Sequence, residues 1–313
     1  MGNSGKQILD DIVANIEKVI MGKKGPIELA VTALICDGHV LVEDVPGVGK
    51  TGMVSALARS VNATFKRIQF TPDVLPSDIT GFSVFNQKTG DFEYRPGTVM
   101  ANFVLADEIN RTPPKTQSSL LEAMEERQVT VDGVTYRLPK PFMVMATQNP
   151  VEYLGTFPLP EAQVDRFLMR ITMGYPSPED ESGILERNMK ENPLDVLTPV
   201  AEGEDIVRMQ EEVRNVHIDR AVNEYIVAIA GRTRIHSDVA LGASIRGTLN
   251  LGRATQAYAY YEGRDYVTPD DVKKMAEPVL SHRIMLKQEA KLRKISPQVV
   301  IQNILDSVKV PVI

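Results

Sequence analysis

The chain has 313 residues, 43% hydrophobic and 24% charged, which suits a globular protein of one large domain or two ordinary ones. Its 41 acidic residues outnumber its 35 Lys and Arg, and the formal net charge of −6 disfavours non-specific nucleic-acid binding as the main activity. The one cysteine, Cys36, cannot form an intrachain disulfide, and its apolar surroundings predict a small core residue. No apolar run approaches the roughly 18 residues of a membrane span, and the polar N-terminus lacks a signal-peptide core, so we expect a cytoplasmic protein.

Two helices are predicted ahead of residue 40. Apolar residues recur at helical spacing between Ile8 and Ile20, which predicts an amphipathic helix that ends near the glycines of residues 21–25. A second helix is predicted over residues 26–36, with its proline in the first turn.

Residues 40–59 have the order that a phosphate-binding loop needs. A short apolar run predicts a buried strand, a Pro/Gly turn follows, and residues 52–59 have helical spacing. Glycines let the backbone approach an anion, and the following helix adds its positive end. In such a loop Lys50 would reach the β- and γ-phosphates, and the Thr51 hydroxyl would bind Mg²⁺. The general pattern has glycine where this chain has Asp44, and Gly-Lys-Thr alone also occurs in ordinary strand–helix turns, so the motif needs support from the rest of the chain.

A strand and a first hairpin follow. Residues 64–70 alternate like a strand. Residues 82–85 and 91–94 flank a polar turn, which predicts a hairpin. A hairpin inserted in a helix–strand alternation is expected to carry contacts rather than the fold.

Residues 102–108 form the second diagnostic stretch. Four apolar positions predict a buried strand that ends in two adjacent carboxylates, Asp107 and Glu108, at the edge where ligands bind in open α/β sheets. One carboxylate could hold Mg²⁺ through water, and its neighbour could polarise an attacking water. A strand ending in solvated acids is common, but the position of this pair after a phosphate loop, in the same alternation, favours the functional interpretation.

A helix over residues 117–126 is followed by a second hairpin over residues 129–138, which the Asp-Gly pair at its centre strongly indicates. The apolar run within residues 142–149, which ends in polar residues, predicts another buried strand. Its last residue, Asn149, could hydrogen-bond a γ-phosphate or orient the water, or it could merely form a turn before the proline that follows.

Arg166 lies between an acid and two apolar residues. It could form a simple ion pair with Asp165 or Glu161, which is the commoner role of an arginine. Alternatively, it could donate its charge to the phosphate of a neighbouring subunit.

The Gly/Pro-rich residues 174–178 indicate a linker, and the pattern beyond them is helical. Helices are predicted over residues 179–190, 203–215, 219–234, 244–262, 268–280 and 301–308. Ser244 suits an N-cap, and Arg246 falls in the first turn of that helix, against the helix dipole. A cation placed unfavourably for its helix suggests a phosphate partner, with a surface salt bridge as the alternative.

Together these stretches resemble the AAA+ ATPases and, within them, the MoxR family, whose phosphate loop also has an acid at the position of Asp44. The likeness runs from about Ile20 to Pro311. Its five motifs stand in the family's order and spacing, at residues 43–51, 70–81, 105–111, 146–150 and 159–167.

The resemblance implies roles for the nucleotide site. The positions that match the nucleotide-binding Walker A loop are Pro46, Gly47, Val48, Gly49, Lys50, Thr51 and Gly52. Met21 and Gly22 resemble the segment that lies beside adenine. Asp107 matches the Walker B partner of Mg²⁺, which Thr51 also binds, and Glu108 matches the base that activates water.

The resemblance also implies roles for residues farther along the chain. Asn149 matches sensor 1, Arg166 the arginine finger that acts on the next subunit, and Arg246 sensor 2 in the lid. The two hairpins match the helix-2 insert and the pre-sensor insert of this clade. Ile245 and Gly247 replace the family's usual Pro and Ala, and the loss of proline from the first turn loosens the local geometry around Arg246.

The fold that the resemblance implies is α/β. A core with a central parallel sheet flanked by helices and two inserted hairpins is expected over residues 1–175, and a smaller all-α lid over residues 176–313. The implied activity is ATP hydrolysis with Mg²⁺ in a ring, expected to be a hexamer.

The implied role is that of a chaperone-like remodeler. It would help a target protein complex to mature or to take up a metal or cofactor, with a von Willebrand factor A domain protein as partner. A chelatase-type motor subunit, a nucleic-acid motor and a non-hydrolysing scaffold are the alternatives. The net acidity disfavours the nucleic-acid motor, and the complete set of catalytic positions disfavours the scaffold.

Overall fold

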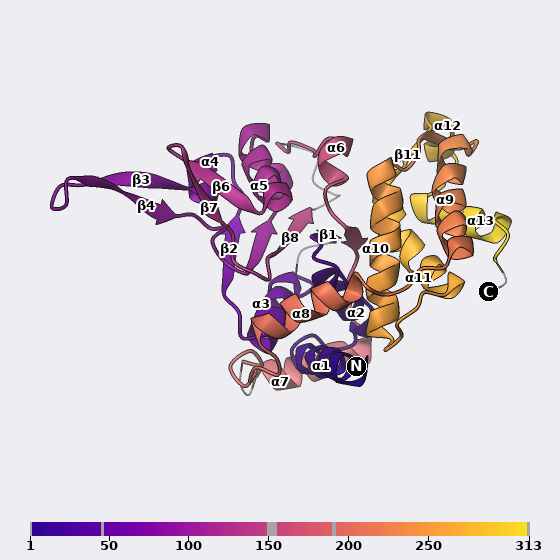
Figure 1. The fold of residues 1–313 in the computed structure, drawn as a ribbon, viewed down its shortest axis with the longest axis horizontal. Coiled ribbons are helices and arrows are strands. Elements are labelled where there is room, and N and C mark those ends of the chain that lie inside the picture. Colours follow the sequence, from indigo (N-terminus) through magenta and orange to yellow (C-terminus); the bar gives the residue numbers. More distant parts are fainter. Residues whose placement is uncertain (1, 45–46, 149–154, 190–191, 312–313) are drawn as a thin grey trace.

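The computed structural model of the chain describes residues 2–44, 47–148, 155–189 and 192–311. At its centre is a five-stranded sheet in the order β2–β5–β8–β1–β9, in which every neighbouring pair is parallel (Figure 1). Its strands are β1 (Val40–Glu43), β2 (Phe65–Gln69), β5 (Phe103–Asp107), β8 (Met143–Gln148) and β9 (Met169–Ile171). Because all pairs are parallel, the carboxyl ends of the strands meet at one edge of the sheet, as the sequence predicts.

Helices cover both faces of this sheet. Phe103 and Leu105 of β5 share a core with the helices α1 (Gly2–Glu17), α2 (Lys24–Ile35) and α3 (Lys50–Ser60). The alternate residues Val104 and Ala106 pack on the other face with α5 (Pro114–Glu126). Side chains of a strand point alternately to the two faces, so burial on both sides explains the continuous apolar runs in the sequence. Cys36 is buried and unpaired, as predicted.

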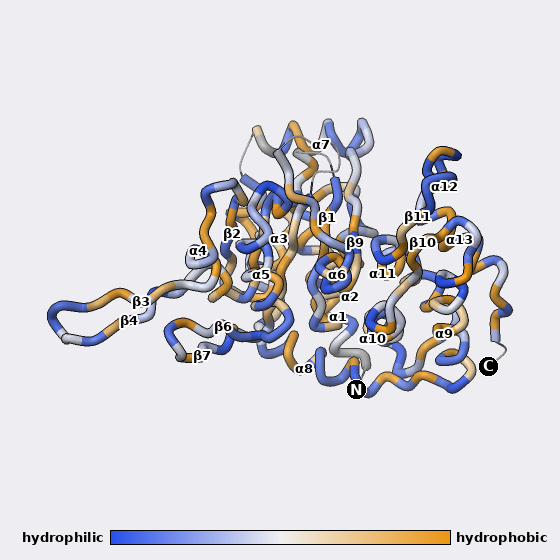
Figure 2. The backbone as a smooth tube through the Cα atoms, turned by 90° about the horizontal axis from the view of Figure 1, so that it is seen from above, coloured by the Kyte–Doolittle hydropathy of each residue, from blue (hydrophilic) through white to orange (hydrophobic). Residues whose placement is uncertain are grey.

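Both predicted hairpins are confirmed as insertions. The first, β3 (Gly81–Asn86) and β4 (Asp91–Pro96), follows the short helix α4 (Pro76–Thr80) and extends away from the body of the molecule (Figures 1 and 2). The second, β6 (Gln128–Val131) and β7 (Val134–Arg137), lies between α5 and β8. Asp132 and Gly133 have φ of +50° and +79°, the two positive values that a tight Asp-Gly hairpin turn requires.

The remainder of the chain is mainly helical. Its helices are α6 (Glu161–Val164), α7 (Pro178–Asn188), α8 (Gly203–Val213), α9 (Arg220–Ile235), α10 (Ile245–Tyr261), α11 (Pro269–Leu280), α12 (Gln288–Leu292) and α13 (Pro297–Ser307). Short 3-10 turns occur at η1 (Ile109–Arg111) and η2 (Ser281–Arg283).

Several features of this region were not predicted, among them the short helices α6 and α12. The strands β10 (Val239–Leu241) and β11 (Met285–Leu286) form an antiparallel pair that is too short to show an alternating pattern in the sequence. The helix α8 lies against the core, where Gln210 donates a hydrogen bond to the Leu34 carbonyl of α2 at 2.8 Å. The division of the chain at residue 175 therefore stays a prediction. Across the described ranges, no helix combines the length and the apolar character that crossing a bilayer demands.

Candidate functional site

The backbone between β1 and α3 has a geometry that suits an anion. Gly47 and Gly49 have φ of +86° and +91°, values that L side chains rarely adopt. A Cβ on Gly47 would meet open space, so its backbone conformation, and not crowding, is what requires glycine there. The helix α3 begins at Lys50 with no acid in its first turn, and its free N–H groups and positive end therefore favour a negative ligand. Val48 packs partly against the apolar core, and Pro46 lies outside the described residues.

Asp44 has a structural role that explains why it replaces glycine. Its carboxylate is buried and accepts hydrogen bonds from the N–H groups of Met173 and Gly174, both at 2.6 Å. The Lys50 ammonium donates to the main-chain oxygen of Asp44 at 3.0 Å. Asp44 thus ties the start of the loop to the chain that leaves β9.

The two acids predicted at the end of β5 are fixed at the carboxyl edge of the sheet. Asp107 accepts hydrogen bonds from the Thr147 hydroxyl and from Nη2 of Arg67, both at 2.6 Å. Glu108 has φ +58°, an uncommon conformation for a residue other than glycine, and its N–H donates to the Thr147 hydroxyl at 2.8 Å. Its carboxylate accepts a hydrogen bond from Gln69 and forms an ion pair with Nε of Arg111 at 3.2 Å.

The loop and the acids line one cavity of about 460 Å³. Its lining residues are Gly47, Gly49, Lys50, Thr51, Gly52, Arg67, Gln69, Asp107, Glu108 and Thr147. The structure therefore brings the predicted phosphate-binding residues together with the predicted Mg²⁺ partner and base, although Thr51 and Asp107 are 56 positions apart in the chain.

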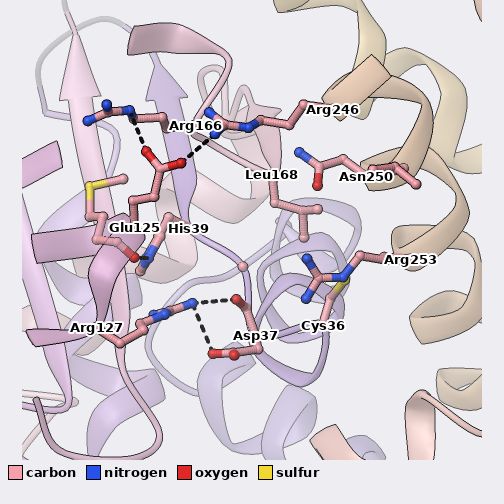
Figure 3. A pocket seen from close by; sticks show the side chains of 13 residues that line it. Cys36, Asp37, His39, Glu125, Arg127, Arg166, Leu168, Arg246, Asn250 and Arg253 are labelled. Carbon is pink, nitrogen blue, oxygen red and sulfur yellow. Dashed lines mark hydrogen bonds and ion pairs between the residues drawn. The ribbon is translucent and has the colours of Figure 1, made fainter. Parts of the chain in front are cut away.

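Arg166 and Arg246 meet in a second cavity of about 520 Å³ (Figure 3). Nε of Arg166 lies 3.0 Å from one carboxylate oxygen of Glu125, and Nη2 of Arg246 contacts the other oxygen. Neither Asp165 nor Glu161, the two partners considered for Arg166 from the sequence, forms an ion pair with it among the described residues, because Asp165 is paired with Arg283 instead. The partner that the sequence did not reveal is Glu125.

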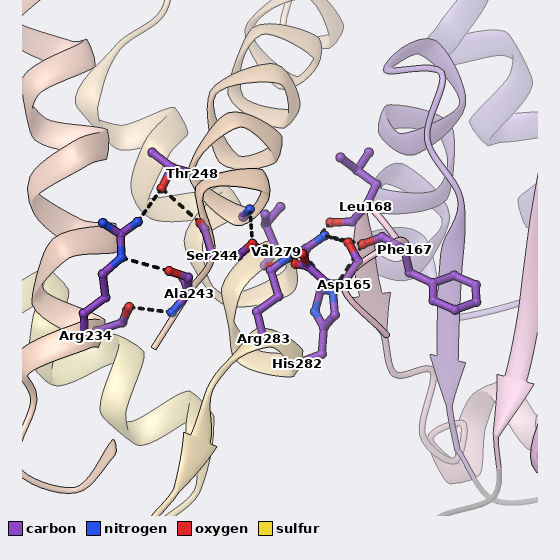
Figure 4. A network of polar contacts seen from close by, with 12 residues as sticks. Asp165, Phe167, Leu168, Arg234, Ala243, Ser244, Thr248, Val279, His282 and Arg283 are labelled. Carbon is purple, nitrogen blue, oxygen red and sulfur yellow. Dashed lines mark hydrogen bonds and ion pairs between the residues drawn. The ribbon is translucent and has the colours of Figure 1, made fainter. Parts of the chain in front are cut away.

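A polar network joins the segment before Arg166 to the helix that carries Arg246 (Figure 4). The Asp165 carboxylate accepts from Nε of Arg283 at 2.8 Å and from the Ser244 hydroxyl at 2.9 Å. Ser244 is the N-cap of α10, and its hydroxyl accepts from the Gly247 N–H at 3.0 Å. The predicted cap is thus confirmed, and it fixes the start of α10 although Ile245 has replaced proline.

Arg283 is buried at the centre of this network. Its guanidinium also donates to main-chain oxygens of Asp165, Phe167, Leu168 and Val279. Burial lowers the pKa of Arg283 to about 10, an effect that the Asp165 carboxylate partly offsets. A buried cation with this many acceptors holds η2 and the end of α11 against the segment 165–168, and Asp165 connects that segment to the N-cap of α10 through Ser244.

Comparisons with known proteins agree with this geometry. The family model "ATPase family associated with various cellular activities (AAA)" matches residues 39–169, and the model "AAA lid domain" matches residues 231–304. Chaperone MoxR1 of Mycobacterium tuberculosis is 44% identical over 312 residues, covering 97% of this chain and 82% of that protein. Protein MoxR of Paracoccus denitrificans is 32% identical, covering 88% of each chain. The chain belongs to the MoxR family of AAA ATPases.

Two further relatives of this MoxR-family chain extend the comparison. An uncharacterized protein of Bacillus subtilis, YeaC, is 56% identical over 305 residues, covering 97% of this chain and 95% of that protein. The crystal structure of a putative ATPase from Cytophaga hutchinsonii superimposes with a TM-score of 0.93 at 40% identity, covering 99% of this chain and 97% of that one. The expected AAA+ fold, with its central parallel sheet and helical lid, is confirmed.

Two other MoxR-family assignments have a different outcome. Met21 and Gly22 pack beside α7, since a Cβ on Gly22 would lie 2.0 Å from the Asp180 carboxylate and one on Gly183 would lie 2.8 Å from the Met21 methyl group. Neither residue lines the loop cavity, although a Cβ on Gly49 of the loop would lie 3.2 Å from Cδ1 of the adjacent Ile20. Their place beside adenine stays a prediction. Asn149, the predicted sensor 1, lies outside the described residues.

Three residues that line the loop cavity were not predicted from the sequence. Arg67 and Gln69 lie on the alternating strand β2, and Thr147 precedes the polar end of β8. For Gln69 and Thr147, a position at or next to the carboxyl end of a parallel strand was the signal that could have identified them, because all such ends face the same edge. Arg67 lies in the middle of β2, where the sequence offers no such signal.

The donor set fits a nucleotide with its magnesium ion. The Lys50 ammonium, the open backbone at Gly47 and the start of α3 suit phosphate oxygens. The Thr51 hydroxyl and the Asp107 carboxylate provide hard oxygen ligands, and Mg²⁺ commonly takes only one or two from the protein and the rest from phosphates and water. Among the described residues, no group of three or more His, Cys, Asp or Glu side chains is placed to hold a metal ion.

Proposed function

We propose that this MoxR-family ATPase hydrolyses ATP as a subunit of a ring, with each active site built from two neighbouring subunits. The phosphate loop of one subunit would bind ATP, and Arg166 and Arg246 of the next subunit would complete the site. We expect a hexamer in the cytoplasm.

The observation that carries this proposal is the placement of the two cavities at opposite edges of the sheet. The loop cavity lies at the carboxyl ends of the strands. The arginine cavity is lined by His39 and Leu168, the residues that immediately precede β1 and β9, so it lies at the amino ends. The two described linings share no residue. The four residues of β1 separate the edges by roughly 13 Å at about 3.3 Å per residue, so the arginines lie at the edge opposite the chain's own loop.

The residues of the loop cavity divide the chemistry among themselves. Lys50 and the N–H groups at the start of α3 would bind and orient the phosphates, while Thr51 and Asp107 would hold Mg²⁺. The bound Mg²⁺ would neutralise negative charge on the phosphate oxygens. Glu108 orients the attacking water, with its carboxylate fixed by Gln69 and Arg111.

The neighbour's arginines act where charge develops. Two guanidinium groups aimed at the transferred phosphoryl group stabilise its oxygens in the transition state, which is the role of an arginine finger. A single chain lacks this charge stabilisation at its own phosphate loop, because its Arg166 and Arg246 are held at the opposite edge of the sheet.

Two single variants test the proposal. Arg166→Ala should lower turnover on the order of 10³-fold, because it removes charge stabilisation from the neighbouring site. Glu108→Gln should still bind ATP but release no phosphate. Both are measured by steady-state phosphate release and by binding of a fluorescent ATP analogue. Arg220→Ala removes an exposed arginine on α9 and should match the wild type. An Arg166→Ala protein that hydrolyses ATP at the wild-type rate contradicts the proposal.

The family relationship suggests what the energy of ATP hydrolysis is used for. The relative named Chaperone MoxR1 supports a chaperone role for the ATPase. The role proposed here is to help a target protein complex mature or take up a metal or cofactor, with a von Willebrand factor A domain protein as partner. The hairpin β3–β4 would contact the target, since Phe82, Phe85 and Phe92 on it are 50%, 52% and 74% exposed.

Capture by an ATP-trapped ring tests this part. The Glu108→Gln protein, loaded with ATP, should retain a target and a von Willebrand factor A domain protein from a cell lysate. Adding Phe85→Ala and Phe92→Ala should release the target while leaving the assembly of subunits intact. The two phenyl groups form an exposed edge-to-face pair with centroids 5.3 Å apart, so their removal should affect contacts with the target and not the assembly. Unchanged capture by the hairpin variant contradicts the assignment of the hairpin.

A further inference from the structure

One acid joins the two arginines that the proposed ring would aim at a neighbour's ATP. Arg166 follows α6 in the core, Arg246 lies in the first turn of α10, and Glu125 lies in the last turn of α5. Each oxygen of the Glu125 carboxylate takes one arginine. Across the residues that the structure describes, Glu125 is the only acid that forms an ion pair with either of them.

The geometry of this contact leaves both arginines able to bind a phosphate. Arg166 uses its Nε, so both of its terminal amino groups remain for another anion. Arg246 uses only Nη2. Two guanidinium groups held close together repel each other, and the carboxylate between them reduces that repulsion. The cavity nevertheless keeps a positive balance, since four arginines and two acids line it.

Glu125 is held firmly on both sides of its position in the chain. The Met124 carbonyl accepts a hydrogen bond from Nε2 of His39 at 3.1 Å. Nδ1 of the same ring accepts from the Val144 N–H at 2.9 Å, which fixes the tautomer. Arg127 donates to the Phe142 carbonyl at 2.7 Å and pairs with Asp37 at 3.0 Å. The carboxylate of Glu125 therefore projects from an anchored helix end.

The position of Glu125 has a local cost. An acid in the last turn of a helix faces the negative end of the helix dipole, which disfavours it. Exposed ion pairs contribute little to stability, so stability alone does not account for the arrangement. An acid placed here is better explained by what it does to the two arginines.

We propose that Glu125 is a positioning residue that holds Arg166 and Arg246 together as one phosphate-binding unit for the active site of the neighbouring subunit. This inference rests on the proposed function, because it needs the arginines to act across the interface. Glu125 itself touches no substrate; it sets the direction of both guanidinium groups before a phosphate arrives.

The first test is the kinetics of Glu125→Gln. Turnover should fall on the order of tenfold because the arginines lose their common orientation, as misplaced groups do in other sites. The KM for ATP should stay within about twofold, because the subunit's own loop binds the nucleotide. The melting temperature should not change. Glu122→Gln, an exposed acid one turn earlier on α5, is the matched control and should behave as the wild type.

The second test locates the effect on one side of the interface. Glu108→Gln and Arg166→Ala subunits are mixed, so that active sites form only where an intact loop meets an intact arginine pair. Placing Glu125→Gln on the Glu108→Gln subunit, which supplies the arginines, should lower the recovered turnover on the order of tenfold. Placing it on the Arg166→Ala subunit should leave the recovered turnover unchanged, because that subunit supplies only the loop. A general folding defect would lower both.

The outcomes separate the two proposals. If the mixture without Glu125→Gln recovers turnover but Glu125→Gln has no effect, or the same effect on either subunit, the role of Glu125 is refuted and the shared site stands. If that mixture recovers nothing while each parent protein assembles, the shared site is refuted, and the role of Glu125 with it.

Discussion

The buried His39 and the partly buried His282 lie close to the residues that hold the arginines in place. Burial lowers the pKa of His39 well below its ordinary value, and the Arg127 charge lowers it further. Burial also lowers the pKa of His282, with a further contribution from Arg283 beside it. Both rings are therefore neutral in the folded protein near pH 6. Each accordingly links the stability of the chain to pH.

The sign of this linkage follows from the two states. Below about pH 6.5 the unfolded chain binds a proton on each of these histidines and the folded chain does not, so the free energy of unfolding falls as the pH falls. One such histidine contributes at most about 1.4 kcal/mol per pH unit to the slope of the free energy of unfolding against pH. His39→Gln should reduce the slope between pH 6.5 and 5 by up to this amount, as measured by urea unfolding. His217→Gln, at an exposed position, is the control. An identical slope in His39→Gln and wild type would show that His39 binds its proton in the folded state.

At the scale of elements, the start of α10 explains one departure from the family pattern. A Cβ on Gly247 would lie 2.9 Å from Cδ of Arg283, a side chain that is buried and held by several hydrogen bonds. On the same helix, a Cβ on Gly252 would meet nothing within 4 Å. The two glycines thus share a helix but differ in their surroundings.

These surroundings predict opposite effects of alanine. Gly247→Ala should destabilise the protein by about 1 to 3 kcal/mol, because the crowded methyl group displaces Arg283. Gly252→Ala should stabilise it by about 0.5 to 1 kcal/mol, because alanine is the better helix former. Thermal and urea unfolding measure both. A Gly247→Ala protein as stable as Gly252→Ala would mean that Arg283 is free to move.

The elements also show what the sequence could predict. The apolar run ending in Asp107 and Glu108 predicted β5 and its edge, because a strand buried on both faces leaves a clear pattern. The partner of Arg166 could not be predicted, because Glu125 is 41 positions away and an exposed ion pair leaves no periodic signal. The pair β10–β11 was missed for its brevity. The role of Asp44 could not be predicted either, because its carboxylate accepts hydrogen bonds from Met173 and Gly174, which follow β9 and are distant in the sequence.

At the scale of the whole molecule, the two cavities lie at opposite edges of the central sheet and make these edges chemically different. One edge of the sheet presents the loop and the opposite edge presents the arginines. Copies that meet with one edge against the other repeat the same contact head to tail, and such a contact closes into a ring when the rotation permits. The family relationship supports the ATPase, and the opposed edges support its operation between subunits.

The most direct test of a site shared between subunits is the turnover of mixed variants. Glu108→Gln and Arg166→Ala proteins, each nearly inactive, are combined in equal amounts and allowed to exchange subunits. The shared site predicts that phosphate release rises to about a quarter of the wild-type rate, since about a quarter of the head-to-tail interfaces then join an intact Glu108 to an intact Arg166. A mixture that assembles but hydrolyses no faster than the sum of its parents would contradict the account.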